Sequence, residues 1–218
     1  HTFFTDLGFR VELSPRSNKQ IYEQGLETIP SDTVCYPAKM AHGHIQALID
    51  AQVPIIFYPG VVFEQQETVE ADNHFNCPIV QSYPDVIRNN VDAIREGQVD
   101  YRNPYLNLAN EAAVAKVLAE NFADLGISLE EIQTALHHGY QELAAFKKEI
   151  QEKGEETLAM LTEKGQRGIV LSGRPYHLDP EINHGIAEVI TQEGFHVLTE
   201  DSISHLGDVQ NLRVVNQW

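Results

Sequence analysis

Residues 54–60 read Pro-Ile-Ile-Phe-Tyr-Pro-Gly. Their apolar part, Ile55-Ile56-Phe57, is β-branched and aromatic, a composition that favours a strand. A short and continuous apolar run that ends at Pro-Gly is typical of a strand buried on both faces of a parallel sheet. This segment therefore predicts an α/β fold.

The chain on either side of this strand alternates between helical and extended patterns. Residues 37–51 predict a helix, because Pro37 suits a first helical turn where its missing N–H has no partner. Residues 61–76 are polar and irregular, and 77–80 predict the start of a strand. A helix over 85–95 and a loop over 101–108 follow in the prediction.

Two short segments share one pattern, Leu-Gly-Phe-Arg-Val at 7–11 and Glu-Gly-Phe-His-Val at 193–197. In both, the glycine is the predicted residue just beyond a helix, and a strand follows, over 9–13 and 195–198. The second copy also has a strand before its helix, at 169–171. The first copy has none, so we expect the first lobe to lack its N-terminal strand.

A long helix is predicted in the second half of the chain. A helix over 110–125 precedes it, and the pair Ser128 and Glu131 forms a capping box. Behind this box the apolar residues follow helical spacing to about Lys164. Gly154 is the predicted weak point of that helix, because glycine lowers helix propensity.

These elements predict two Rossmann-like lobes with open parallel sheets, linked by a long helical segment. The predicted boundaries are a first lobe over 1–100, a connecting segment over 101–165 and the start of a second lobe over 166–218. A further short helix is predicted over 182–193. The chain begins at His1 inside a helical pattern and stops without a polar tail, so we expect it to be a piece of a longer protein.

The composition argues against several classes of function. The chain has 218 residues, and 15 Lys+Arg against 32 Asp+Glu give a net charge of −17. Such a surface repels phosphate backbones and anionic lipids, so neither nucleic acid nor a membrane is an expected partner. Two cysteines make no disulfide framework, which favours a reducing, cytoplasmic compartment.

The two cysteines are the first candidates for chemistry. Cys35 lies between a predicted strand end and a helix start, where free N–H groups and nearby Lys39 favour a thiolate. Cys77 is followed by Pro78, and a Cys-Pro pair commonly ends a cluster-binding run. Because ligands gather at the carboxyl ends of parallel strands, we expect both thiols, and residues 58–60, at one sheet edge. The alternative is two buried thiols that act as small hydrophobic residues.

Histidines near the first cysteine offer a second arrangement. His42 and His44 lie two residues apart on one predicted helix, so at most one of them faces Cys35. A zinc site built from Cys35, Cys77, one of these histidines and His74 is an alternative, although its spacing matches no usual zinc pattern.

A second dense stretch, residues 172–179, reads Ser-Gly-Arg-Pro-Tyr-His-Leu-Asp. Arg174 suits a carboxylate or phosphate, and His177 and Asp179 suit the sharing of a proton. Arg174, Tyr176 and His177, together with His42 and His44, are the candidates to line a substrate pocket. The alternative is a capped loop in which Asp179 begins a helix.

Four motifs together resemble a known family: Ser-Asp-Thr-Val-Cys-Tyr-Pro-Ala-Lys at 31–39, His-Gly-His at 42–44, Asn-Cys-Pro at 76–78 and Gly-Arg-Pro-Tyr-His at 173–177. The chain is similar to the activators of 2-hydroxyacyl-CoA dehydratase, the CoA-substrate-specific enzyme activases. It resembles their region that is itself similar to the cluster-carrying dehydratase subunits.

The resemblance implies a four-iron, four-sulfur (4Fe–4S) or related cluster and low-potential electron transfer linked to acyl-CoA dehydration or reduction. It implies an actin-like ATPase module as partner, with ATP bound only there, and an acyl-CoA or a dehydratase as the second partner. By position, Cys35 and Cys77 match the first two cluster cysteines. Dehydratase subunits use three, so the third ligand is open.

Several alternatives remain at this stage. The chain has no P-loop or other nucleotide-hydrolysis motif, so we expect no activity from it alone. A cluster-free domain that binds acyl-CoA or docks a partner is the second hypothesis. A homodimer is compatible with either, and a structural zinc domain is the third reading.

Overall fold

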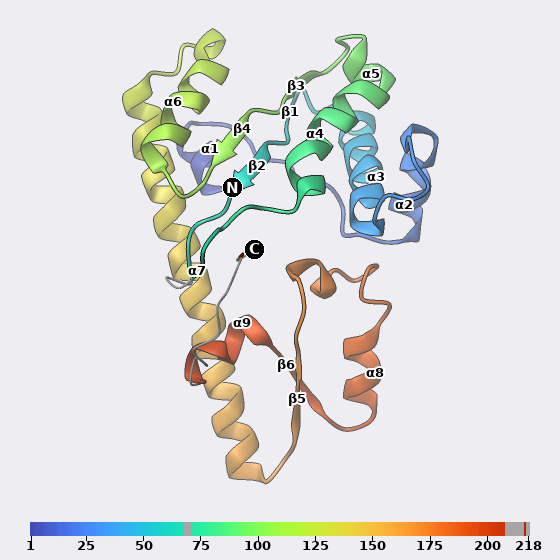
Figure 1. The fold of residues 1–218 in the computed structure, drawn as a ribbon, viewed down its shortest axis with the longest axis vertical. Helices are drawn as coiled ribbons and strands as arrows, with labels where there is room; N and C mark the ends of the chain where they lie inside the picture. Colours follow the sequence, from blue (N-terminus) through green and yellow to red (C-terminus); the bar gives the residue numbers. More distant parts are fainter. Residues whose placement is uncertain (68–70, 208–215, 217–218) are drawn as a thin grey trace. The chain divides into compact units, whose positions relative to one another are not determined.

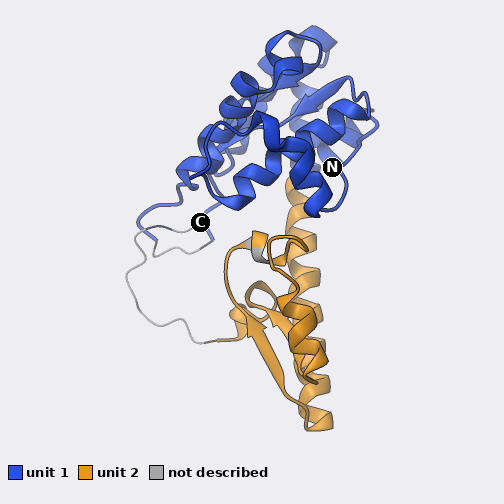
Figure 2. Cartoon of the chain, turned by 90° about the vertical axis from the view of Figure 1, so that its right-hand side faces the viewer, with its two compact units in different colours: residues 1–139, 212–218 blue, residues 140–211 orange. Residues whose placement is uncertain are grey.

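The computed structural model describes residues 1–67, 71–207 and 216. The chain divides into two compact units (Figure 2): His1–Gly139 with Leu212–Trp218 form unit 1, and Tyr140–Asn211 form unit 2. Among the helices of the described residues, none has the length and apolar character needed to cross a bilayer.

Unit 1 is built on a parallel ribbon of four short strands. Strand β1 (Ile55–Phe57) pairs with β3 (Asp100–Arg102), and β2 (Gly60–Phe63) pairs with β4 (Tyr105–Asn107). The ribbon is interrupted between β1 and β2 at Pro59 and between β3 and β4 at Pro104, because proline lacks the N–H that a ladder needs. The extended chain nevertheless continues through them, because Gly60 N donates to Pro104 O at 3.0 Å.

Helices α3 (Tyr36–Asp50) and α4 (Pro78–Asn90) pack beside this ribbon (Figure 1). Helix α3 ends just before β1. After β2 the chain doubles back, with Asn76 N donating to Val62 O, so α4 begins beside the junction of β1 and β2, where Gln81 O lies close to Gly60. With α5 (Asp92–Arg95), α4 forms the crossover to the parallel strand β3. Their common core contains eight buried residues, namely Ala38, Ile45, Ile56, Tyr83, Ile87, Val91, Ile94 and Tyr101.

Helix α2 (Lys19–Gly25), followed by the short 3-10 helix η1 (Leu26–Thr28), crosses α3 in close contact. The crossing depends on two glycines. A Cβ at Gly43 would lie 1.8 Å from Ile21 O, and a Cβ at Gly25 would lie 2.3 Å from Gly43 N. Only glycine lets the two backbones approach this far.

The remaining helices of unit 1 cover the other part of the ribbon: α1 (Thr2–Asp6), α6 (Glu111–Asn121), the 3-10 helix η2 (Ala123–Leu125) and the first turns of α7 (Leu129–Lys164). Phe4 and Phe57 form an edge-to-face pair with ring centroids 5.0 Å apart. Nearby, the buried Arg102 guanidinium lies 4.9 Å from the Phe122 ring centroid and binds Asp100 and Asp124. Charge pairing and ring contact together hold β3 to η2.

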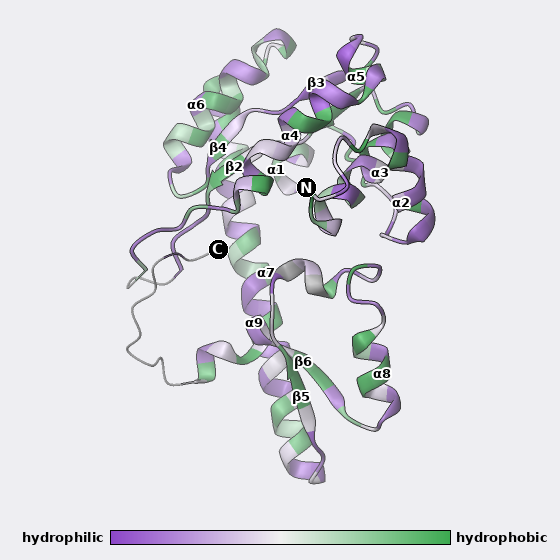
Figure 3. Ribbon diagram, turned by 45° about the vertical axis from the view of Figure 1, so that its right-hand side comes forward, coloured by the Kyte–Doolittle hydropathy of each residue, from purple (hydrophilic) through white to green (hydrophobic). Residues whose placement is uncertain are grey.

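Unit 2 contains a two-stranded parallel sheet. Strands β5 (Gly168–Leu171) and β6 (His196–Thr199) pair in register, and α8 (Ile186–Gln192) lies between them in sequence. Figure 3 shows the apolar colouring of β5. The short helix α9 (Glu200–Ile203) packs on α7 at Gly154, where an added Cβ would lie 2.0 Å from Ser202 O. The 3-10 helix η4 (Ser204–Leu206) follows α9.

Several sequence-based predictions are confirmed. The α/β class, the strand at 55–57, the helix at 36–50 and the strands of unit 2 are present. Glu131 accepts a hydrogen bond from Ser128 N and Ser128 Oγ accepts one from Glu131 N, as a capping box requires. Helix α7 does run to Lys164. Gly154 does not interrupt it, because the glycine is there to admit α9.

Other predictions are wrong. Residues 9–13 and 33–35 are not strands, because the structure offers neither segment a partner strand among the described residues. Residues 77–80 begin helix α4 and not a strand. Residues 101–108 hold most of β3 and all of β4 and not a loop; Pro104 lies between the two strands, and its carbonyl accepts from Gly60 N.

Two further predictions need adjustment. Residues 60–63 form β2, so the region after Gly60 is irregular only beyond that strand. The helix expected over 182–193 begins only at Ile186, after a series of turns. The predicted domain boundaries, at 100 and 165, stay predictions.

Candidate functional site

Cys35 occupies the position directly before helix α3. Its backbone is extended, with φ −61° and ψ 149°, and Pro37 lies in the first turn that follows. Its carbonyl accepts hydrogen bonds from Ala38 N and Lys39 N at 3.1 and 3.2 Å. Its side chain makes no capping hydrogen bond and is exposed. The backbone is therefore fixed while the thiol stays accessible.

Lys39 lies in the first turn of α3 and contacts the loop before Cys35. Its Nζ donates to the backbone carbonyl of Asp32 at 2.6 Å. This contact closes the turn that leads into Cys35, so the ammonium group shapes the loop.

Cys77 has the same position before helix α4, with Pro78 as the first helical residue. The chain returns from β2 along an antiparallel path, in which Asn76 N donates to Val62 O at 2.9 Å. The Asn76 side chain then accepts from Cys77 N at 2.9 Å. The Cys77 thiol makes no capping bond and is half-buried.

The two cysteine loops pack on the same core. Val34 lies immediately before Cys35, and Ile79 lies two residues after Cys77; both contact the hydrophobic cluster that contains Tyr83. Tyr58, the residue after β1, packs on this cluster too. The winding of the chain thus brings both loops to one core at the edge of the ribbon beside Tyr58, at the carboxyl end of β1.

A buried hydrogen-bonded chain lies beneath this edge. His42 is 0% exposed, and its Nδ1 lies 2.8 Å from Thr28 Oγ1 while its Nε2 lies 2.9 Å from the Tyr83 hydroxyl. Thr28 Oγ1 donates its only hydrogen to Gly25 O at 3.0 Å. It must then accept from His42 Nδ1–H, which leaves Nε2 to accept from the Tyr83 O–H.

Burial keeps these groups neutral. It lowers the pKa of His42 from 6.5 to about 4, because imidazolium loses its hydration there. Burial, with smaller contributions from nearby Tyr58 and Cys35, raises the pKa of Tyr83 to about 12. Desolvation raises the pKa of Tyr58 as well. The groups beside Cys35 are therefore hydroxyls and a neutral imidazole at pH 7.

Sequence reasoning selected part of this arrangement. It named His42 as a candidate for the pocket, and the strand-end rule named Tyr58. It missed Thr28 and Tyr83, because their pairing with His42 depends on the crossing of η1, α3 and α4. The spacing of these residues along the chain carries no signal of it.

His44 faces elsewhere on α3. Its Nε2 lies 3.0 Å from Ser17 Oγ, while His74 packs its ring 5.4 Å from that of Phe63. Nowhere in the described ranges do three His, Cys, Asp or Glu side chains gather as a metal ion would require. The proposed four-ligand zinc site is therefore not formed by these residues.

The second predicted stretch lies in unit 2, where Pro175–Leu178 form the 3-10 helix η3. Asp179 Oδ1 accepts from Glu181 N at 2.9 Å and Ile182 N at 3.0 Å, so it caps the turns that follow. Tyr176 is exposed and Arg174 half-buried. The His177 side chain lies outside the described part. The joint role of Arg174, Tyr176 and His177 in a substrate pocket stays a prediction.

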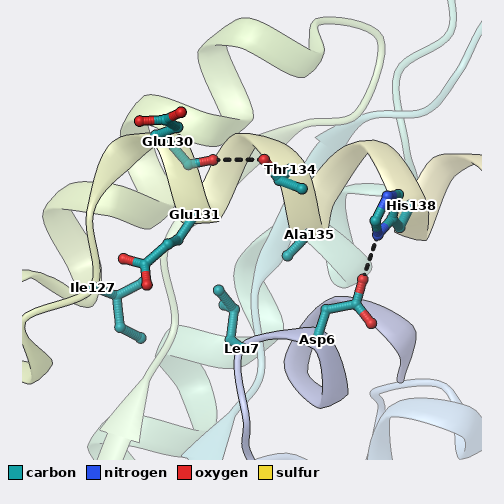
Figure 4. Close-up of a pocket in the computed structure, with 8 residues that line it drawn as sticks. All are labelled: Asp6, Leu7, Ile127, Glu130, Glu131, Thr134, Ala135 and His138. Atoms are coloured by element: carbon teal, nitrogen blue, oxygen red, sulfur yellow. Dashed lines mark hydrogen bonds and ion pairs between the residues drawn. The ribbon is translucent and has the colours of Figure 1, made fainter.

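A surface hollow of about 540 Å³ lies between α1 and α7 (Figure 4). Most of its polar side chains already have partners. His138 Nδ1 lies 2.6 Å from Asp6 Oδ2, Glu131 serves the capping box, and Thr134 Oγ1 donates to Glu130 O at 2.9 Å. This hollow is therefore accounted for by the packing of two helices.

Among the described residues, the cysteine edge offers fewer ligands than an iron–sulfur cluster needs. A four-iron cluster takes four thiolate-type ligands. Cys35 and Cys77 would supply two of these ligands. Since no third ligand gathers with them in the described ranges, the others would come from another chain or another part of the protein.

Comparison with known proteins gives one match. Residues 1–203 match a family described as the CoA enzyme activase uncharacterised domain. No curated protein and no solved structure matches the chain.

Proposed function

Because the chain belongs to the CoA enzyme activase domain family, we propose that it is the part of an activase system that holds an iron–sulfur cluster for electron delivery to CoA-ester chemistry. In this proposal Cys35 and Cys77 are two of the cluster ligands. A Rossmann-like, two-lobe architecture, with unit 2 as the start of the second lobe, belongs to the same proposal.

One observation carries the proposal. Each cysteine directly precedes a helix, each has a proline in the turn that follows, and neither thiol makes a capping bond. The N–H groups of a helix start favour a nearby negative charge, which suits thiolate ligands. The residues beside both cysteines share one core cluster, so the two loops are held in a fixed relation.

The protein's own residues have defined parts in this proposal. The core under the two loops fixes the cysteine backbones. Beneath them, Tyr83 is hydrogen-bonded to His42, so the groups below the edge are rigid and neutral. A bound cluster would supply a one-electron carrier of low potential. Hydrogen bonds and burial around the sulfurs would set that potential.

The partners are part of the proposal as well. We expect an ATPase module to supply the electron and an acyl-CoA enzyme or its substrate to receive it. In that scheme Arg174, Tyr176 and His177 contribute to the substrate side. A reducing, cytoplasmic compartment would keep both cysteines as thiols.

Anaerobic reconstitution with iron and sulfide tests the ligand assignment. The wild-type chain should bind iron and sulfide, turn brown and absorb broadly in the visible range. Cys35→Ala and Cys77→Ala should each lose most of this absorbance and bound iron. A matched control is Thr33→Ala, which changes the same loop without removing sulfur.

The outcomes separate clearly. A wild-type protein that stays colourless, alone and with the proposed partner module, would refute the cluster proposal. So would cysteine variants that bind as much iron as the wild type. Circular dichroism of each variant checks that lost iron is not lost folding.

A second candidate function is a cluster-free domain that binds acyl-CoA or docks the partner. The observation in its favour is the shortage of ligands, since only two thiols lie at the edge and no third ligand joins them in the described residues. Binding of a CoA ester by the iron-free protein, unchanged in Cys35→Ala, would support it over the first candidate.

A further inference from the structure

A second hollow of unit 1, of about 370 Å³, lies at the opposite end of α4 from Cys77. Its size falls in the range of small-molecule sites. It is lined by six residues, namely Arg88, Asn89, Ile94, Arg95, Val99 and Tyr101. Apolar side chains from α5 and from the segment before β3 therefore meet two guanidinium groups there.

The charge of this hollow is unusual for the chain. The chain has 32 acidic and 15 basic residues, yet the lining contains two arginines and no carboxylate. A local positive site on a negative protein attracts anions selectively, because the surrounding surface repels them.

Arg88 has only neutral partners. Its Nη2 donates to Asn103 Oδ1 and, at 3.5 Å, to Tyr101 O. The nearby carboxylate of Asp85 accepts instead from Asn103 Nδ2 and the Tyr105 hydroxyl. Within the described part of the chain, no carboxylate lies at ion-pair distance from Arg88, and its Nε and Nη1 have no hydrogen-bond partner.

Arg95 has one partner that a ligand can displace. Its Nη2 lies 2.7 Å from Asp92 Oδ1 on the same short helix, and both side chains are well exposed. Exposed ion pairs of this kind contribute little to stability, since water and salt screen them. The Arg95 guanidinium can therefore bind an anion with little loss of protein stability.

From these contacts we propose that the hollow binds the phosphate group of a small organic molecule. Arg88 and Arg95 hold the phosphate oxygens through charge-assisted hydrogen bonds. Ile94, Val99 and the edge of Tyr101 contact the organic part. The site is separate from the cysteine edge and does not depend on a cluster.

A purely structural role for Arg88 makes a different prediction. Arg88 lies in the last turn of α4, where a positive charge stabilises the helix. That role would affect unfolding but would require no anion. Binding measurements therefore distinguish the two roles.

Isothermal titration of the full chain with inorganic phosphate, ATP and CoA tests the proposal, with adenosine as the phosphate-free probe. We expect at least one phosphate-bearing probe to bind and adenosine not to bind. Tighter binding of CoA than of ATP would identify a CoA-type ligand, and tighter binding of ATP would identify a nucleotide. If inorganic phosphate binds as tightly as both, the hollow is an anion site without selectivity for an organic part.

Variants then locate the site. Arg88→Gln and Arg95→Gln should each weaken binding about tenfold or more, while Arg10→Gln, at an exposed ion pair elsewhere in unit 1, should not. Arg95 has no buried partner, so its variant decides the matter if Arg88→Gln fails to fold. The proposal is overturned if no phosphate-bearing probe binds, if adenosine binds equally well, or if both pocket variants bind like the wild type.

Discussion

The buried imidazole of His42 makes a prediction that follows directly from the structure: unit 1 becomes less stable as the pH falls from 7 to 5. In the folded state burial lowers the pKa of His42 from 6.5 to about 4. In the unfolded chain the imidazole regains its ordinary pKa. Below pH 6.5 the unfolded state therefore binds more protons than the folded state, and the equilibrium moves toward unfolding.

The magnitude follows from these two pKa values. Proton linkage gives a loss of about 2 kcal/mol in the free energy of unfolding at pH 5, and about 3 kcal/mol once the pH falls below 4. The loss is of this size because His42 is fully buried and its two ring nitrogens are both bonded. Salt should change it little, since the effect is desolvation and not a surface ion pair.

Urea unfolding, followed by circular dichroism at pH 7 and pH 5, measures the effect. The wild-type midpoint should fall by about 1 M urea for a chain of ordinary cooperativity. His42→Gln keeps a side chain that can donate and accept but does not titrate, so its midpoint should move far less between the two pH values. The other histidines are common to both proteins and cancel in the comparison.

Two results would contradict this reasoning. One is a wild-type stability that does not change between pH 7 and pH 5. The other is an equal change in wild type and His42→Gln, which would place the pH dependence in other groups. Hydrogen exchange of peptides from α3 and α4 checks that the lost stability belongs to unit 1.

Three further predictions concern stability. Arg102→Ala should lower the free energy of unfolding by about 2 kcal/mol in urea denaturation, because it removes the contact with the Phe122 ring and the bonds to Asp124. Arg102→Lys should recover only part of this loss. Equal stability of the wild type and both variants would refute a stabilising role for Arg102. Gly43→Ala should destabilise unit 1 by about 3 kcal/mol or more, since the new Cβ would overlap the Ile21 carbonyl, and a folded variant with unchanged thermal midpoint would show that the α2–α3 crossing is misplaced. Ser128→Ala should cost about 1 kcal/mol and speed hydrogen exchange in the first turn of α7 alone, whereas unchanged exchange there would argue against the capping box.

Local features of the structure were readable from the sequence. The capping box at Ser128 and the apolar strand at 55–57 depend on residues close together in the chain. The repeated helix ends at Gly8 and Gly194 are another example: both glycines have left-handed backbones, with φ +85° and +84°. After each glycine, the backbone N–H of the next residue, Phe9 or Phe195, donates to the carbonyl of the residue five positions earlier. The same local pattern therefore gives the same turn.

The partner of each element was decided only by the tertiary structure. Residues 9–13 and 195–198 follow equivalent turns, yet only the second segment finds a parallel partner and becomes a strand. In the same way β3 and β4 form because β1 and β2 lie beside them, and Pro104 O accepts from Gly60 N between the two pairs. A strand needs hydrogen bonds from a distant segment, and the sequence of the strand alone does not specify that segment.

The same distinction between sequence and tertiary structure applies to the candidate site. The sequence by itself determined the reactive groups of the site. These are two cysteines, each before a helix that begins with a proline in its first turn, and a histidine on the helix that follows Cys35. The tertiary structure decided that both cysteine loops rest on one core, that His42 is sealed against Tyr83, and that Arg88 meets Arg95 in a hollow. Side-chain type is fixed by the chain, whereas burial and neighbourhood arise only when helices far apart in sequence pack together.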